Sequence, residues 1–281
     1  MQNISEILNK SINYLKENNT NSAVLDSELL LCSIINKPRE YLFLNLNKKI
    51  NDISVKKYFS LVKRRKNSEP IAYILNKKDF WKSTFYVDQG VLIPRPDTEI
   101  LIEEALSCMS KKKNLSILDI GTGSGCIILS ILQEVQKASG IGIDISKNAV
   151  KVANFNAKMH QLENRVKFIK SSVDNFFKGK YDLIISNPPY INNCELSYLE
   201  RDIYRFEPLV ALEGGNDGLS LIKKVIEKSS KLLKTGGKLI LEIGYDQKFK
   251  IEKLLKDKKF YVNRVKKDYG RNFRCIVCTK I

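Results

Sequence analysis

Ten residues near the middle of the 281-residue chain, S-I-L-D-I-G-T-G-S-G at Ser116–Gly125, join an apolar run to a glycine-rich turn. The apolar run favours a short buried strand, and the next residues, 126–132, continue as the apolar start of a helix. A strand, a glycine turn and a helix in this order are typical of the first unit of a nucleotide-binding α/β sheet. The stretch therefore predicts an α/β fold with a ligand site at the turn.

The acid in this turn discriminates between ligands. The dinucleotide pattern G-x-G-x-x-G fails, because Cys126 stands where the last glycine is needed. Asp119 lies two residues before the first glycine, where its carboxylate would repel a pyrophosphate but attract an ammonium group. S-adenosylmethionine carries an ammonium group, a carboxylate and a sulfonium, so we expect the turn to bind this cofactor. The turn residues expected to lie against it are Gly121, Thr122, Gly123, Ser124 and Gly125.

A second acid follows at the end of the apolar run Ile141–Asp144, 23 residues after Gly121. An acid at this place typically accepts hydrogen bonds from ribose hydroxyls. Alternatively, Asp119 caps the helix and Asp144 lies in an ordinary turn. The presence of both acids at the expected spacing favours cofactor binding.

A further motif, N-P-P-Y at Asn187, Pro188, Pro189 and Tyr190, follows the apolar run Leu183–Ile185. Residues at the carboxyl end of a buried parallel strand lie where open α/β sheets bind ligands. The two prolines would hold the carboxamide and nearby carbonyls rigidly. Rigid acceptors beside an aromatic ring suit a planar NH2 group, so the motif favours methyl transfer to such a nitrogen. A stiff turn without function is the alternative.

On these motifs, the chain resembles the protein-(glutamine-N5) methyltransferases that modify peptide chain release factors. The resemblance covers nearly the whole length, and its most specific segment is I-P-R-P-x-T-E at Ile93–Glu99. Other matching segments are Glu69–Ile74, Glu207–Leu209, Ala211–Leu212, Gly214–Gly215, Asp217–Leu219, and Lys267–Gly270 with Arg274. Two positions depart from the family. Asn76 replaces a usual glycine, and Ser171–Asp174 replaces a segment expected against the adenine, so that either Ser172 or Val173 could take that place.

The resemblance implies methyl transfer from S-adenosylmethionine to the side-chain amide nitrogen (N5) of the glutamine in a Gly-Gly-Gln loop. We hypothesise that the side-chain oxygen of Asn187, which also borders the cofactor, and the Pro188 carbonyl accept the two hydrogens of this NH2. Tyr190 would pack on the flat amide, and Pro189 would hold the loop. The alternative function is N-methylation of an exocyclic amino group of adenine or guanine in nucleic acid, because the same four residues suit that nitrogen too.

Composition restricts the partners. The net charge of +17 is spread along the chain, without the aromatic-interleaved basic stretch of an RNA module, so no stable nucleic-acid partner is expected. No run of 18 apolar residues occurs, which predicts a cytoplasmic protein without a membrane partner. The six scattered cysteines predict no metal site. We expect a monomer whose partners are release factors.

The order of elements, together with what the resemblance implies for the role of each part, predicts the domains: a helical substrate-recognition domain at 1–78, a β-hairpin linker at 79–95 and a methyltransferase domain at 96–281. In the linker, Val91–Ile93 is expected to form a strand. In the stretch that joins the two domains, Arg95 and Glu99 could border the substrate entrance, cap a helix or pair between domains. Thr98 is expected to cap the helix that opens the methyltransferase domain. The last domain alternates strands and helices. Its expected strands are at Ile117, Ile141, Val166–Ile169, Leu183–Ile185, Lys238–Glu242, Tyr261–Val265 and Phe273–Thr279. The final two strands lack an intervening helix, so an antiparallel hairpin should close one edge. This is the seven-stranded Rossmann-like sheet of a class I S-adenosylmethionine-dependent methyltransferase.

Overall fold

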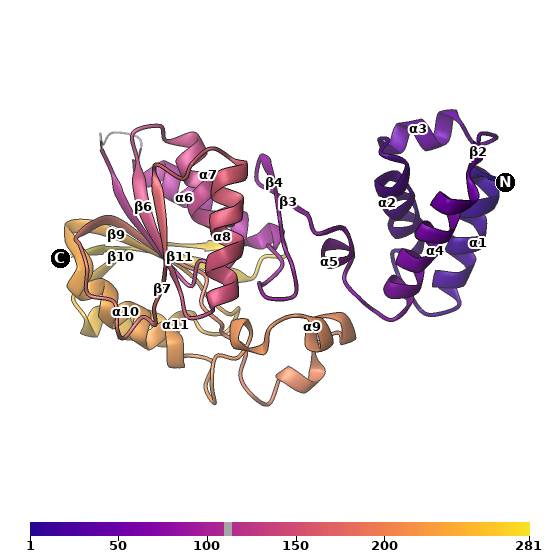
Figure 1. Ribbon diagram of the computed structural model, residues 1–281. Coiled ribbons are helices and arrows are strands. Elements are labelled where there is room, and N and C mark those ends of the chain that lie inside the picture. The colour runs from indigo at the N-terminus through magenta and orange to yellow at the C-terminus, as the bar shows by residue number, and fades with distance from the viewer. Residues whose placement is uncertain (110–113) are drawn as a thin grey trace. The chain divides into compact units, whose positions relative to one another are not determined.

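The computed structural model describes residues 1–109 and 114–281, which form two compact units (Figure 1). The smaller unit contains residues 1–76 and 200–206, and the larger contains residues 77–199 and 207–281. In this described part of the chain, no helix has the length and apolar character needed to cross a membrane.

The smaller unit is helical. Its helices are α1 (Ile4–Lys16), α2 (Ala23–Ile35), α3 (Arg39–Leu44), α4 (Asp52–Lys66), α5 (Ile71–Leu75) and α9 (Arg201–Phe206), and β1 (Gln2–Asn3) pairs with β2 (Lys49–Ile50). Apolar stripes at helical spacing, such as Ile4, Ile7 and Leu15, form its core. Asn76 ends α5 in the left-handed region with φ 53°, a conformation that asparagine tolerates better than most residues. The turn in which the related family has glycine is therefore compatible with Asn76.

A short antiparallel hairpin, β3 (Lys78–Phe80) with β4 (Ser83–Phe85), opens the larger unit. Trp81 closes its turn with φ 56°. The expected strand at Val91–Ile93 is wrong, because this segment has no strand structure. The physical reason is local: the Asp88 carboxylate accepts hydrogen bonds from the backbone N–H of Gly90 (2.8 Å) and from Asn148 Nδ2 (3.0 Å), which folds the preceding residues into a turn.

The larger unit is built on a sheet with strand order β10-β11-β9-β8-β5-β6-β7. The strands are β5 (Ser116–Ile120), β6 (Ser139–Asp144), β7 (Val166–Lys170), β8 (Tyr181–Ser186), β9 (Leu233–Glu242), β10 (Phe260–Lys267) and β11 (Phe273–Lys280). Strands β5 to β9 pair in parallel, whereas β11 runs antiparallel to both β9 and β10. The seven-stranded sheet and its closing antiparallel hairpin are thus confirmed.

Helices cover both faces of this sheet (Figure 1). One face packs against α6 (Glu99–Met109), α7 (Cys126–Glu134) and α8 (Lys147–Met159), and the other against α10 (Ser220–Leu232) and α11 (Lys248–Asp257). Successive strand residues alternate between these two cores, so that Ile117 contacts the first and Leu118 the second. Cys275 and Cys278 likewise face opposite sides of the sheet.

The two sequence motifs meet where the strand order changes direction. Strand β5 lies between β6 and β8, and Ile120 at its end pairs with Ser186 at the end of β8. The Ser186 hydroxyl also donates to the Ile120 carbonyl (2.7 Å). Gly121 and Asn187 therefore leave the same edge of the sheet from neighbouring strands, at the point where open α/β sheets bind ligands.

Candidate cofactor and substrate site

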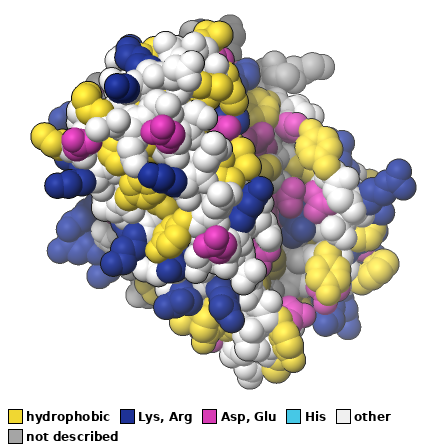
Figure 2. Space-filling view, turned by 90° about the vertical axis from the view of Figure 1, so that its right-hand side faces the viewer, with side chains coloured by type: hydrophobic (Ala, Val, Ile, Leu, Met, Phe, Trp, Pro, Cys, Tyr) yellow, Lys and Arg dark blue, Asp and Glu magenta, His cyan; other side chains and the backbone are white. Residues whose placement is uncertain are grey.

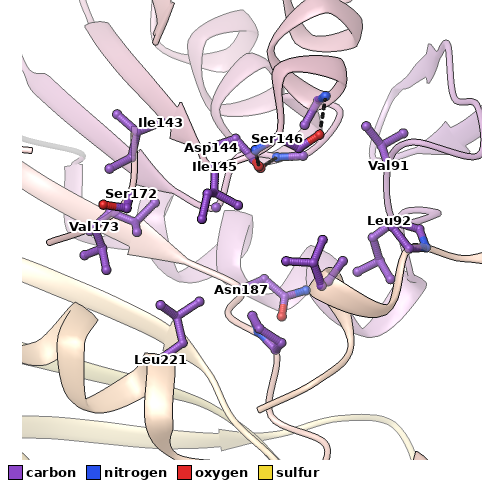
Figure 3. Close-up of a pocket in the computed structure, with 18 of the residues that line it drawn as sticks. Val91, Leu92, Ile143, Asp144, Ile145, Ser146, Ser172, Val173, Asn187 and Leu221 are labelled. Carbon is purple, nitrogen blue, oxygen red and sulfur yellow. Dashed lines mark hydrogen bonds between the residues drawn. The ribbon is translucent and has the colours of Figure 1, made fainter. Parts of the chain in front are cut away.

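A cavity of about 380 Å³ lies at the carboxyl ends of β5, β6 and β8 (Figure 3). The residues of the sequence-based site that line it are Gly121, Gly123, Asp144, Ser172, Val173, Asn187 and Pro189. Its volume is in the range of small-molecule sites. Apolar side chains that the sequence analysis did not identify complete the wall: Val91, Leu92, Ile143, Ile145, Val210 and Leu221.

The glycine turn has the backbone that its sequence requires. Gly121, Gly123 and Gly125 have φ values of 74°, 55° and 79°, in the left-handed region where a side chain is strained. Gly125 is also the N-cap of the nine-residue helix α7, and within the described residues no side chain caps this end. Residues 125–128 do not line the cavity, so a contact between this helix start and the carboxylate of S-adenosylmethionine stays a prediction.

Asp119 lies buried directly behind this turn, not in the cavity wall. Its Oδ2 accepts a hydrogen bond from Thr122 Oγ1 (2.6 Å), and its Oδ1 has no partner in the described part of the chain. Burial raises the pKa of the Asp119 carboxyl to about 7. A carboxylate that lacks a full set of partners next to a cavity fits a ligand with an ammonium group. Ser124 is buried behind the turn as well.

Asp144 joins the glycine turn to the end of β6. Its Oδ2 accepts from the backbone N–H of Gly123 (2.9 Å), and its Oδ1 accepts from the backbone N–H of Ser146 (2.9 Å; Figure 3). Burial raises the pKa of the Asp144 carboxyl. Each oxygen retains acceptor capacity, because a carboxylate oxygen can accept more than one hydrogen bond. Asp144 can therefore accept hydrogen bonds from ribose hydroxyls, as the sequence analysis predicts.

Ser172 and Val173 both reach the cavity, so the two alternatives for the adenine contact stay open (Figure 3). The Ser172 hydroxyl accepts from the backbone N–H of Asn175 (3.3 Å). Val173 is buried within the apolar core. With Ile145 and Leu221 also in the lining, this end of the cavity has the apolar walls that an aromatic base requires.

The carboxamide of Asn187 lies in the cavity wall (Figure 3). Its Nδ2 donates a hydrogen bond to Thr98 Oγ1 (3.2 Å). Among residues 1–109 and 114–281, no hydrogen bond to its Oδ1 is found, so this oxygen retains both lone pairs for a ligand. Pro188 is buried and does not line the cavity.

Tyr190 points behind the loop. Its hydroxyl donates to Glu242 Oε1 (3.4 Å) and accepts from Arg274 Nη1 (3.3 Å), and burial raises its pKa to about 12. Gln247 Nε2 donates to the Tyr190 carbonyl (3.0 Å). These contacts fix the loop from behind. That Tyr190 packs on a substrate amide stays a prediction, because its ring does not line the cavity.

Thr98 directly precedes α6, but the expected cap is wrong: within the described residues its hydroxyl bonds to Glu242 and Asn187 and to no backbone N–H of that helix. It ends a short 3-10 turn, Pro96–Thr98, and its hydroxyl donates to Glu242 Oε2 (2.7 Å). Glu242, which the sequence analysis did not select, is buried at the end of β9, and burial raises its pKa to about 7. A signal was available: Glu242 is an acid at the carboxyl end of an expected strand.

Two charged residues of the I-P-R-P-x-T-E segment, Arg95 and Glu99, hold loops together. The Arg95 guanidinium pairs with Glu207, whose other oxygen accepts from the backbone N–H of Ile93 (3.3 Å). Glu99 accepts from the backbone N–H of Trp81 (2.8 Å) at the hairpin turn. Arg95 therefore pairs within the larger unit, and it connects this segment to the segment beginning at Glu207.

In a comparison with known proteins, each of the two units matches a family model. Residues 111–277 match the family model described as "Methyltransferase domain", and residues 6–75 match the "PrmC N-terminal domain". A release factor glutamine methyltransferase from Fusobacterium nucleatum is 38% identical over 98% of this chain and 78% of its own length. One from Clostridium acetobutylicum is 36% identical over 99% of this chain and 98% of its own length.

A crystal structure of ribosomal protein L11 methylase from Lactobacillus delbrueckii subsp. bulgaricus shares the fold, with a TM-score of 0.52 and 22% identity over 69% of this chain and 83% of that one. The family assignment rests on the two curated relatives, since both alignments extend over nearly the whole chain. The chain belongs to the release factor glutamine methyltransferase family.

Proposed function

We propose that this enzyme transfers the methyl group of S-adenosylmethionine to the side-chain amide nitrogen of the glutamine in the Gly-Gly-Gln loop of peptide chain release factors. The observation that carries the proposal is the Asn187 carboxamide, whose Oδ1 keeps its acceptor capacity in the wall of the same cavity as Asp144 and the glycine turn. When bound, S-adenosylmethionine supplies an electrophilic methyl group on its sulfonium.

The enzyme must make the amide nitrogen of the substrate glutamine, a weak nucleophile, reactive. The lone pair of an amide nitrogen is delocalised into its carbonyl, and two acceptors that take its hydrogens would localise this lone pair. Asn187 Oδ1 is one such acceptor, and the Pro188 carbonyl is the second in our proposal. Acceptors held in place before the reaction stabilise the positive charge that develops on nitrogen without reorganisation. Alignment of the nitrogen with the methyl group supplies a further part of the acceleration.

The alternative substrate, a base in nucleic acid, is not favoured. The relatives that align over almost the whole chain are named for release factors, and residues 6–75 match the same family's N-terminal domain. On the face in Figure 2, lysine and arginine side chains are interspersed with apolar and acidic ones. We further propose that the enzyme acts as a cytoplasmic monomer, and that residues 1–78 recognise the release factor, with residues 79–95 as the linker to the methyltransferase domain at 96–281.

The test is incubation with S-adenosylmethionine labelled in the methyl group and either a release factor or nucleic acid. We expect label in the Gly-Gly-Gln peptide. Asn187→Ala should retain cofactor affinity within a few fold and lose about 100-fold in methyl transfer, comparable to the loss of one oxyanion donor. Asn154→Ala, at an exposed position on α8, is the matched control. Label in nucleic acid alone, or near-normal turnover of Asn187→Ala, would contradict the proposal.

A further inference from the structure

A continuous hydrogen-bond chain runs from the cavity wall into the protein core. Asn187 Nδ2 donates to Thr98 Oγ1 (3.2 Å), and Thr98 Oγ1 donates to Glu242 Oε2 (2.7 Å). Thr98 and Glu242 are each only 2% exposed. Water therefore has little access to these groups, and each hydrogen bond between them has a fixed donor and a fixed acceptor.

The direction of the chain determines which end of the Asn187 carboxamide faces the cavity. A hydroxyl has one proton, and that of Thr98 goes to the Glu242 carboxylate. Toward Asn187, the Thr98 oxygen can then act only as an acceptor, so it selects Nδ2 over Oδ1. A rotation of the carboxamide by 180° would place two acceptors, Thr98 Oγ1 and Asn187 Oδ1, against each other in a buried site.

The carboxylate end of the chain is also held. Glu242 Oε1 accepts from the Tyr190 hydroxyl (3.4 Å), and that hydroxyl accepts from Arg274 (3.3 Å). Arg274 in turn pairs with Asp268 (3.0 Å). Because both oxygens of Glu242 have donors on fixed elements, the carboxylate cannot turn away from Thr98 without losing a partner.

We propose that Thr98 and Glu242 are positioning residues that fix the orientation of the Asn187 carboxamide, so that its oxygen faces the target NH2 of the substrate. The inference rests on the proposed function. It gives the family-specific threonine of the I-P-R-P-x-T-E segment a role in substrate activation without contact with the substrate.

An isosteric substitution of Glu242 should reverse the direction of the hydrogen bonds from Asn187 through Thr98 to residue 242. In Glu242→Gln, the Tyr190 hydroxyl still needs an acceptor, so the glutamine Oε1 faces Tyr190 and its Nε2 faces Thr98. The Thr98 oxygen then accepts from glutamine and donates its proton to Asn187, which favours the rotated carboxamide. The asparagine would now present its NH2 to the NH2 of the substrate, and two donors repel each other.

The experiment compares Thr98→Val, Thr98→Ser and Glu242→Gln with the wild-type full-length enzyme. We measure turnover at saturating release factor and S-adenosylmethionine, cofactor affinity by calorimetry, and the thermal midpoint of unfolding. Valine keeps the shape of threonine without the hydroxyl, whereas serine keeps the hydroxyl. We expect Thr98→Val and Glu242→Gln to lose at least 10-fold in turnover with cofactor affinity within threefold, and Thr98→Ser to retain most of the turnover.

Turnover of Thr98→Val and Glu242→Gln within threefold of wild type would overturn the inference while leaving the proposed function intact. A Thr98→Ser variant as slow as Thr98→Val would also overturn it, because the hydroxyl would then not be the determinant. Loss of cofactor affinity or of the folded state in parallel with turnover would assign the pair a purely structural role and overturn it too. Absence of methyl transfer by the wild-type enzyme would overturn the proposed function, and the inference with it.

Discussion

Replacement of Asp119 by asparagine should make the ligand-free enzyme more stable and its cofactor binding weaker. The Asp119 carboxylate is completely buried, and one of its oxygens has no partner in the described residues. Burial is the main cause of its raised pKa, and the nearby Asp144 carboxylate raises it further. A site that holds an uncompensated negative charge before its ligand arrives costs folding free energy, and a cationic ligand would offset that cost.

The magnitude follows from the pKa. A shift from 3.8 to about 7 is roughly 3 units, or about 4 kcal/mol at 1.36 kcal/mol per unit, as an upper value. Because the folded state binds this proton more tightly than the unfolded state, the free energy of unfolding falls as the pH rises from about 4 to about 7. Asparagine carries no such charge but leaves an amide with incomplete hydrogen bonds. A net gain of about 2 kcal/mol at pH 8 is therefore expected.

The assay is urea unfolding of ligand-free wild type and Asp119→Asn at pH 8 and pH 5, with calorimetry of S-adenosylmethionine binding. The gain of about 2 kcal/mol at pH 8 should become a loss of about 1 kcal/mol at pH 5, a change of roughly 3 kcal/mol, since about two of the three units lie between pH 5 and pH 7. Cofactor affinity at pH 8 should fall at least 10-fold, because the carboxylate behind the turn no longer attracts the ammonium group of the cofactor. Asp257→Asn, exposed at the end of α11, is the control. A variant less stable than wild type at pH 8, or an advantage independent of pH, would refute the reasoning.

Two further predictions concern the substrate side of the site. Turnover at saturating substrates should rise tenfold per pH unit below about 7 and level off above it, because ionised Glu242 is required and its pKa is about 7. Burial is the main cause that raises this pKa, and Asp97 raises it further, whereas Thr98, Arg274 and Tyr190 lower it; the Cys275 thiol is the neighbour on β11. This acidic limb should persist in Asp119→Asn and disappear in Glu242→Gln; the reverse result would assign it to Asp119. Glu207→Ala should lower the free energy of unfolding by about 2 kcal/mol in urea, because it leaves the partly exposed Arg95 without its partner and the Ile93 N–H without an acceptor. Glu227→Ala, in an exposed pair with Lys231, should leave the unfolding midpoint unchanged, and an equal loss in both variants would contradict the role of Glu207.

The sheet could be predicted from the sequence because each strand carries a local signal. The run at 183–185 is continuously apolar, and the run at 117–120 is interrupted only by Asp119, as expected for parallel strands covered on both faces; both are in the centre of the sheet. The same signal was misleading at Val91–Ile93. There Val91 and Leu92 line a cavity, and the turn contacts of Asp88 hold the segment, so burial occurred without strand pairing.

The site could be predicted as far as its residues adjoin a motif. Asp144 and the glycine turn were recognisable because strand ends at this edge of an α/β sheet converge on the ligand. The partnership of Thr98 with Glu242 was not recognisable, because 144 positions separate the two residues and no local pattern links them. A threonine before a helix is commonly a cap, and only the tertiary structure shows that its hydroxyl is used elsewhere.

The proposed role of Asn187 also explains why this position needs an amide in place of a stronger acceptor. A carboxylate would attract the hydrogens of the substrate NH2 more strongly, but the Thr98 oxygen offers an acceptor to this position and would repel it. A carboxylate would also add negative charge to a region that already contains Asp119, Asp144 and Glu242. The amide group donates with one end and accepts with the other, so one planar side chain can be oriented by the core and still present a lone pair to the cavity. The orientation of the neutral Asn187 acceptor thus depends on the negative charge of Glu242 deeper in the protein. Variants of the two residues therefore have to be tested together.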